Sequence, residues 1–136
     1  MIRTLLALCL LSSASAPAQQ PATRFTTVEV YVNASTRPLA AWQIELNCDP
    51  LQAKIVGVEG AGPKPPYYDP AALEGGRIIL ADFSTEPLLP TGRVLVARVH
   101  FQETGSVIYT PRLMAAAAAG GERFDPTIEL VQAGGK

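Results

Sequence analysis

The sequence contains few of the residues that metal sites, disulfides and catalytic centres use. Among 136 residues there are 2 cysteines and 1 histidine, with no Asp-x-Asp-x-Asp-Gly calcium loop and no paired Cys or His ligands. A hydroxyl-histidine-carboxylate centre would need the single histidine, His100, which shares a strand face with Arg98 and Gln102 and has no nucleophile beside it in the sequence. We therefore expect no metal, no cofactor and no catalytic residue.

Acidic residues are numerous enough to form carboxylate pairs, which is the one enzyme-like feature. Asp82 with Glu86, or Asp69 with Glu74, could approach each other as the chemistry of glycoside hydrolysis requires. Scattered surface carboxylates usually serve solvation instead, so we interpret them as non-catalytic.

The chain also lacks a basic excess and has only one long apolar run. Its formal charge is −1, which argues against nucleic acid or an anionic membrane as the main partner. The apolar run, residues 5–11, follows the lone charge of Arg3 and precedes a stretch of small residues, the pattern of a cleavable signal peptide rather than of a spanning helix.

Two small-x-small cleavage frames occur, and we favour cleavage after Ala18, because cleavage after Ala16 would leave Pro17 at the new N-terminus. We thus expect residues 1–18 to be a signal peptide and residues 19–136 to be one domain that is secreted, either outside the cell or into the periplasm, with no membrane insertion after cleavage. Cys9 would leave with the signal peptide and Cys48 would have no intrachain partner, so stability must come from a packed core rather than from disulfides.

Two-residue alternation of apolar and polar side chains dominates the remaining sequence and predicts β-strands with one buried face. In residues 40–48, for example, Trp42 and Ile44 share the inward phase while Gln43 and Glu45 take the outward phase. The segments with strand character are residues 24–32, 40–48, 54–59, 77–83, 93–103, 107–110 and 127–132. Short strands separated by turn signals favour an all-β, antiparallel sandwich or jelly roll.

Two segments remain open. The alanine run 115–119 fits either a short helical turn or a strand with small side chains. Residues 60–76 are rich in glycine and proline and form one long loop, in which Tyr67 and Tyr68 either offer rings for stacking on a sugar or fold back over an edge of the sandwich.

Five segments carry a family pattern: residues 39–50, which end in Asp49-Pro50, residues 55–58, residues 76–84, residues 92–101 and the closing Gly134-Gly135. Together they resemble the cohesin domain. The resemblance covers nearly all of residues 19–136 in order. It implies a jelly-roll sandwich of about nine strands and a non-catalytic role in docking dockerin modules at the cell surface. Recognition positions of the family fall at Ala41 and Gln43, and Asp82 falls near an acidic contact.

These observations lead to one hypothesis and two alternatives. The hypothesis is a secreted, cohesin-like module that binds a dockerin-like protein partner through an outward sheet face including Gln43, Glu45 and Asp82. The first alternative is a carbohydrate-binding module that holds a polysaccharide with Tyr67 and Tyr68. The second is a structural subunit of a surface assembly.

Overall fold

A computed structural model describes residues 14–17 and 22–134. Most of the predicted signal peptide, including its cleavage site after Ala18, lies outside the described residues, as do residues 18–21 and 135–136. Residues 14–17 are exposed and belong to no helix or strand. The predicted export and the domain boundary at residue 18 therefore stay predictions.

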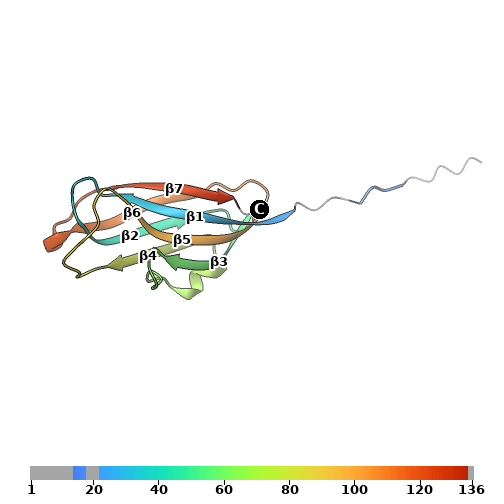
Figure 1. Ribbon diagram of the computed structural model, residues 1–136. Coiled ribbons are helices and arrows are strands. Elements are labelled where there is room, and N and C mark those ends of the chain that lie inside the picture. Colours follow the sequence, from blue (N-terminus) through green and yellow to red (C-terminus); the bar gives the residue numbers. More distant parts are fainter. Residues whose placement is uncertain (1–13, 18–21, 135–136) are drawn as a thin grey trace, which may run out of the picture.

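The strands form two antiparallel sheets that pack face to face (Figure 1). The four-stranded sheet has the order β3 (Ala53–Gly60), β5 (Arg93–Thr104), β1 (Thr23–Asn33) and β7 (Thr127–Gly134). The three-stranded sheet has the order β4 (Arg77–Phe83), β2 (Leu39–Asn47) and β6 (Thr110–Ala118). Two short 3-10 helices, η1 (Pro70–Glu74) and η2 (Ala119–Gly121), lie in the connections. The predicted antiparallel β-sandwich is confirmed.

The core lies between the sheets and follows the alternation in the sequence. Val28, Val30 and Val32 of β1 are fully buried, and Ile44 of β2 faces them from the other sheet with no exposed surface. Trp42 is 8% exposed, so its predicted place in the core is confirmed. Fully burying an aliphatic side chain contributes about 1.5–3 kcal/mol, which is how the described part of the chain, in which Cys48 is free, is stabilised without a disulfide. Cys48 is a free, half-buried thiol whose pKa is raised by burial.

The expected number of about nine strands is wrong, because the described residues form seven. Prolines in the long loop cannot donate to a ladder, and only Tyr67 pairs there, as an isolated bridge to Ala81. Of the predicted strand 107–110, only Thr110 lies in a ladder, as the first residue of β6. The alanine run, left open by the sequence, belongs to β6 as far as Ala118.

β3 is shorter than its partner β5 and covers only part of that strand's edge, which leaves one side of the sandwich open. A Cβ atom on Gly60 would lie 2.0 Å from the carbonyl oxygen of Lys64, so the chain folds back over Gly60 at a distance that only glycine permits. β3 pairs with β5 from Ala97 to Glu103 and stops there, whereas β5 begins at Arg93.

Candidate functional site

Small side chains occupy the centre of the outer face of the three-stranded sheet. Gln43 of β2 lies opposite Ala81 of β4 on one side and Ala115 of β6 on the other. One step along β2, Ala41 lies opposite Phe83 and Ala117. The lack of long side chains leaves a shallow depression of about 230 Å³, which Gln43 and Arg123 also line. We call this surface the alanine face and define its centre by Ala41, Gln43, Ala81, Ala115 and Ala117.

Large exposed side chains border the depression on both sides. The rings of Tyr67 and Phe83 are nearly parallel, with centroids 6.2 Å apart, and the two residues are 66% and 64% exposed. Tyr67 is held there by its backbone, which donates to the Ala81 oxygen at 2.8 Å and accepts from the Ala81 nitrogen at 3.0 Å. On the β6 side Met114 is exposed, and the side-chain amide of Gln43 lies 3.7 Å from its sulfur.

A charged cluster closes one end of the alanine face, with Glu45 at its centre. The Glu45 carboxylate accepts hydrogen bonds from the Asn47 amide at 2.9 Å, from Arg77 Nε at 2.5 Å and from both Nε and Nη2 of Arg112 at 3.3 Å. Its side chain is only 9% exposed. The hydrogen bond from Asn47, then that from Arg112, outweigh burial and lower the pKa of Glu45 from 4.5 to about 2. Glu45 is therefore ionised and fully engaged by its own neighbours.

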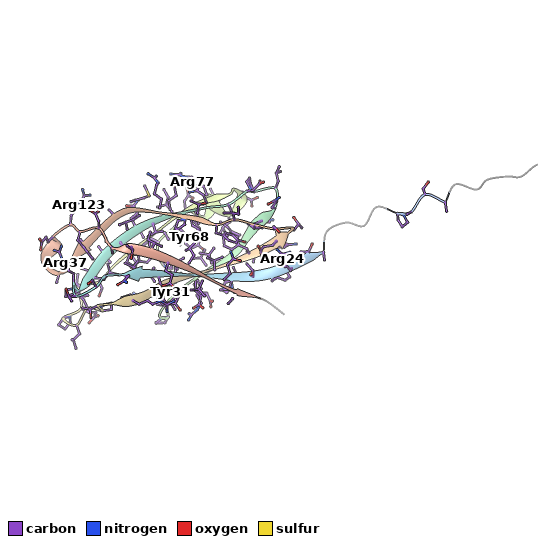
Figure 2. All side chains as sticks on the ribbon, turned by 90° about the horizontal axis from the view of Figure 1, so that it is seen from above. Arg24, Tyr31, Arg37, Tyr68, Arg77 and Arg123 are labelled. Atoms are coloured by element: carbon purple, nitrogen blue, oxygen red, sulfur yellow. The ribbon has the colours of Figure 1, made fainter. Side chains whose placement is uncertain are left out.

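The arginines around Glu45 remain available to a partner. The side chains of Arg77 and Arg112 are 59% and 61% exposed although both contact the carboxylate. Figure 2 shows Arg77 and Arg123 on the side of the sandwich formed by the three-stranded sheet, with Tyr31 on the opposite side. Arg77 and Arg112 against the single carboxylate of Glu45, with Arg123 at the other end beside Ala117, give the alanine face a positive rim, which favours a partner with acidic groups.

The structure brings three of the predicted site residues together and separates two. Gln43 and Glu45 share the alanine face, as expected, and Tyr67 joins them from the long loop. Asp82 does not share this face. It lies opposite Trp42 in the ladder and has the same phase as Ile78 and Leu80, so its side chain is on the inner side of β4. Tyr68 is half-buried against the core, so it forms no platform with Tyr67.

On the outer face of the four-stranded sheet most charged groups are paired with one another, although Phe25 of β1 is exposed there. His100 is 2.9 Å from the Thr27 hydroxyl through Nδ1 and 2.6 Å from Glu59 through Nε2. No sequence pattern indicated these neighbours, which come from β1 and β3. The remaining contacts on this face are the bidentate Arg93–Glu129 pair, the stacking of Arg93 on Tyr31 at 3.7 Å and the Arg98–Glu29 pair at 3.5 Å.

Sequence reasoning missed Phe83, Met114 and Arg123 as members of the site. Phe83 has the outward phase of its predicted strand, so alternation alone could have identified it. Identifying Met114 depends on recognising the alanine segment as a strand, and Arg123 follows η2 in a connection that has no periodic pattern.

Within residues 14–17 and 22–134, no three His, Cys, Asp or Glu side chains are grouped as a metal ion would need. No helix of that part of the chain has the length and apolar character to cross a membrane.

Comparison with known proteins identifies the fold. No family model matches the chain, and no curated protein matches it in sequence. The structure is similar to that of the seventh ScaB type I cohesin from Pseudobacteroides cellulosolvens, with a TM-score of 0.57 and 11% sequence identity, over 76% of this chain and 75% of that chain. The chain therefore has a cohesin-like β-sandwich fold.

Proposed function

We propose that this protein is an exported, non-catalytic binding module that docks a partner protein on the alanine face. The observation that carries the proposal is the contrast between an apolar depression with exposed aromatic, methionine and arginine borders and a second sheet face whose charges are paired. Tyr, Phe, Met and Arg are enriched in protein interfaces, and hot spots lie in central pockets with a polar rim. The cohesin-like fold supports the same class of function.

The proposed partner presents a protruding apolar side chain and flanking carboxylates. The apolar group would enter the depression above Ala81 and Ala115, between Tyr67 and Met114. The carboxylates would meet Arg77 and Arg112, whose side chains are positioned by their hydrogen bonds to Glu45. In this arrangement Gln43 contacts the partner directly, whereas Glu45 is a positioning residue. A dockerin-like module is one partner of this chemistry.

A glycan platform built from both loop tyrosines has no support in the geometry, since Tyr67 is exposed while Tyr68 packs against the core. Sugar binding needs exposed, coplanar rings with polar neighbours. We therefore retain protein docking as the proposed function.

Photo-crosslinking from the two sheet faces tests the proposal. A benzoylphenylalanine at position 43 would sit in the centre of the alanine face, and the same group at position 102 would sit on the outer face of β5 as the matched control, because both positions are half-buried glutamines on outward strand sites. With material secreted by the source cells, we expect a protein adduct from position 43 and none from position 102. Adducts of equal yield from both positions, or from position 102 alone, would overturn the proposal.

A further inference from the structure

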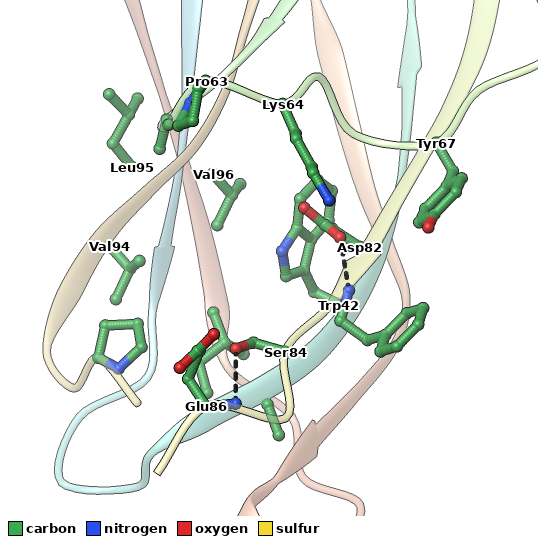
Figure 3. A pocket seen from close by; sticks show the side chains of 16 residues that line it. Trp42, Pro63, Lys64, Tyr67, Asp82, Ser84, Glu86, Val94, Leu95 and Val96 are labelled. Carbon is green, nitrogen blue, oxygen red and sulfur yellow. Dashed lines mark hydrogen bonds between the residues drawn. The ribbon is translucent and has the colours of Figure 1, made fainter. Parts of the chain in front are cut away.

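A second concave surface, a cleft of about 680 Å³, lies on the open side of the sandwich where β3 has ended. Its apolar lining includes Trp42 of β2 with Val94 and Val96 of β5, and its charged lining consists of Lys64, Asp82 and Glu86 (Figure 3). The cleft lies on the inner side of β4, whereas the alanine face lies on the outer side. The cleft is therefore distinct from the centre of the alanine face, but the two surfaces meet at Tyr67 and Phe83, which also line the cleft.

One wall of this cleft is an unpaired strand edge. β5 pairs with β1 from Arg93 to Thr104, with a bulge at Val96, but pairs with β3 only from Ala97 onward. No described strand lies beside residues 93–96 on the cleft side, where loop residues 61–64 form part of the cleft wall. An edge of this kind presents peptide N–H and C=O groups at the spacing that another extended chain can pair with.

The indole of Trp42 supplies a donor without an acceptor. Although Trp42 is only 8% exposed, none of the side-chain hydrogen bonds in the described part of the chain involves its indole nitrogen. Among the described residues, only the Tyr109 hydroxyl is a side-chain polar atom that has neither solvent contact nor a hydrogen-bond partner, so the Trp42 indole nitrogen is in contact with solvent. Figure 3 shows the indole nitrogen pointing into the cleft, toward the side on which Val96 lies. Buried indole N–H groups ordinarily have an acceptor, so this one is available to a bound carbonyl.

The charges of the cleft favour a cation. In the described residues neither Asp82 nor Glu86 has a salt-bridge partner, and Lys64 has none. Asp82 accepts one hydrogen bond, from the backbone N–H of Phe83 at 2.8 Å, which leaves most of its acceptor capacity open. Two carboxylates against one ammonium group leave the cleft with a formal charge of −1.

We propose that this cleft binds an extended segment of a partner polypeptide, which adds as a strand to β5 beside Arg93–Val96. The segment's backbone pairs with the free edge, and one of its carbonyl oxygens accepts the Trp42 indole N–H. Alternate side chains of an added strand point to the same side. Those facing inward are therefore small aliphatic groups resting on Val94 and Val96 and a lysine or arginine reaching Asp82 and Glu86. A sugar lacks the regular donors and acceptors that the edge of β5 needs.

The single tryptophan makes this proposal measurable in the purified chain by NMR. The probe is the peptide acetyl-Thr-Val-Thr-Lys-Thr-Val-Thr-amide, which places valine and lysine on one side of an extended strand. We expect it to shift the one indole N–H resonance and the amide resonances of residues 93–96, and to leave those of Arg112 and Ala115 on β6 unchanged. No shift at millimolar peptide, or shifts confined to the alanine face, would overturn the proposal.

Peptide and protein variants test the main-chain and charge contributions separately. N-methylation of every second amide, in each of the two alternate phases, blocks one edge of the peptide at a time. We expect one phase to weaken binding at least about tenfold, because several backbone hydrogen bonds are lost, and the other to bind normally. Equal binding by both phases would rule out strand addition.

The charge test compares Glu86→Gln with Glu74→Gln, an exposed carboxylate on η1 outside the cleft. We expect Glu86→Gln to weaken binding about 2–5-fold, as loss of an exposed ion pair does, and Glu74→Gln to have no effect. An equal effect of the two substitutions would show that the lysine is not held at this carboxylate and would overturn that part of the proposal.

Discussion

The two outer faces of the sandwich differ in how they use charge. On the four-stranded sheet, Glu29, Glu59 and Glu129 each contact a basic side chain of β5, and Tyr31 is covered by Arg93. On the three-stranded sheet, most of the charge gathers at one end around Glu45, Arg123 lies at the other end beside Ala117, and the centre consists of alanines with exposed Tyr67, Phe83 and Met114. A face whose polar groups satisfy one another has little to offer a protein partner. A face with exposed apolar groups and accessible arginines does, which is why we assign docking to the three-stranded sheet.

The largest effect that we expect comes from disrupting the sheet beneath the alanine face. Ile44 lies between Gln43 and Glu45 in β2 but points inward and has no exposed surface. Ile44→Ala should lower the free energy of unfolding by about 2–5 kcal/mol, because a large cavity opens in the core. Gln43→Ala, its outward neighbour, should change it by less than about 0.5 kcal/mol. Urea unfolding measures both, and equal losses would contradict the inward and outward assignment of β2.

Substitution of the two loop tyrosines should have effects of intermediate size on stability and on docking. Tyr68→Ala should cost about 1–2 kcal/mol of stability, since this ring is half-buried against the core. Tyr67→Ala should stay within about 0.5 kcal/mol, because the ring is exposed, yet it should weaken docking of the partner. Thermal unfolding and partner retention, measured on the same two variants, separate these outcomes. Loss of docking from Tyr68→Ala alone, in a variant that remains folded, would count against the alanine face.

A smaller, pH-dependent effect on the free energy of unfolding is expected from one carboxylate of each sheet, beginning with Glu45. Because the folded-state pKa of Glu45 is lowered to about 2, its ionised form stabilises the fold above pH 4.5, and this contribution is lost as the pH falls through about 2. Glu45→Gln should therefore destabilise the protein at pH 7 and have far less effect near pH 2. Unfolding by urea across this range gives the two curves. A constant difference between wild type and variant would contradict the assigned hydrogen bonds.

The matching substitution on the other sheet is Glu129→Gln. The hydrogen bonds from Arg93 lower the pKa of Glu129, so its contribution too is present at neutral pH and lost in acid. Its side chain is 54% exposed against 9% for Glu45, so solvent screening should make its effect the smallest of those described here. A larger loss from Glu129→Gln than from Glu45→Gln would reverse the comparison of the two clusters.

Much of the fold could be predicted from alternation, whereas the site depends on contacts that alternation does not contain. The phase of residues 77–83 already places Asp82 with Ile78 and Leu80 and places Phe83 outward, but the family resemblance suggested an outward Asp82. The cluster around Glu45 requires the register of β2 against both β4 and β6, which no local pattern specifies.

Two further features depend on the chain's path outside the regular strands. The Tyr67–Phe83 pair depends on the path of a proline-rich loop that forms only one bridge. β6 was hard to predict because alanine has high helix propensity, and its pairing with β2 overrides that preference. Propensity and periodicity describe single segments, and these contacts join segments that are far apart in the sequence.

The most direct test of the central claim places the same bulky charge on each face. Ala81→Arg would fill the depression of the alanine face, and Val131→Arg would place an arginine on the outer face of β7, opposite Glu29. If the alanine face docks the partner, the protein captured by crosslinking from position 43 should bind Val131→Arg as it binds wild type and should bind Ala81→Arg at least about 30-fold more weakly, the loss of a hot spot. Retained binding by a folded Ala81→Arg variant, or loss of binding by Val131→Arg alone, would contradict the account.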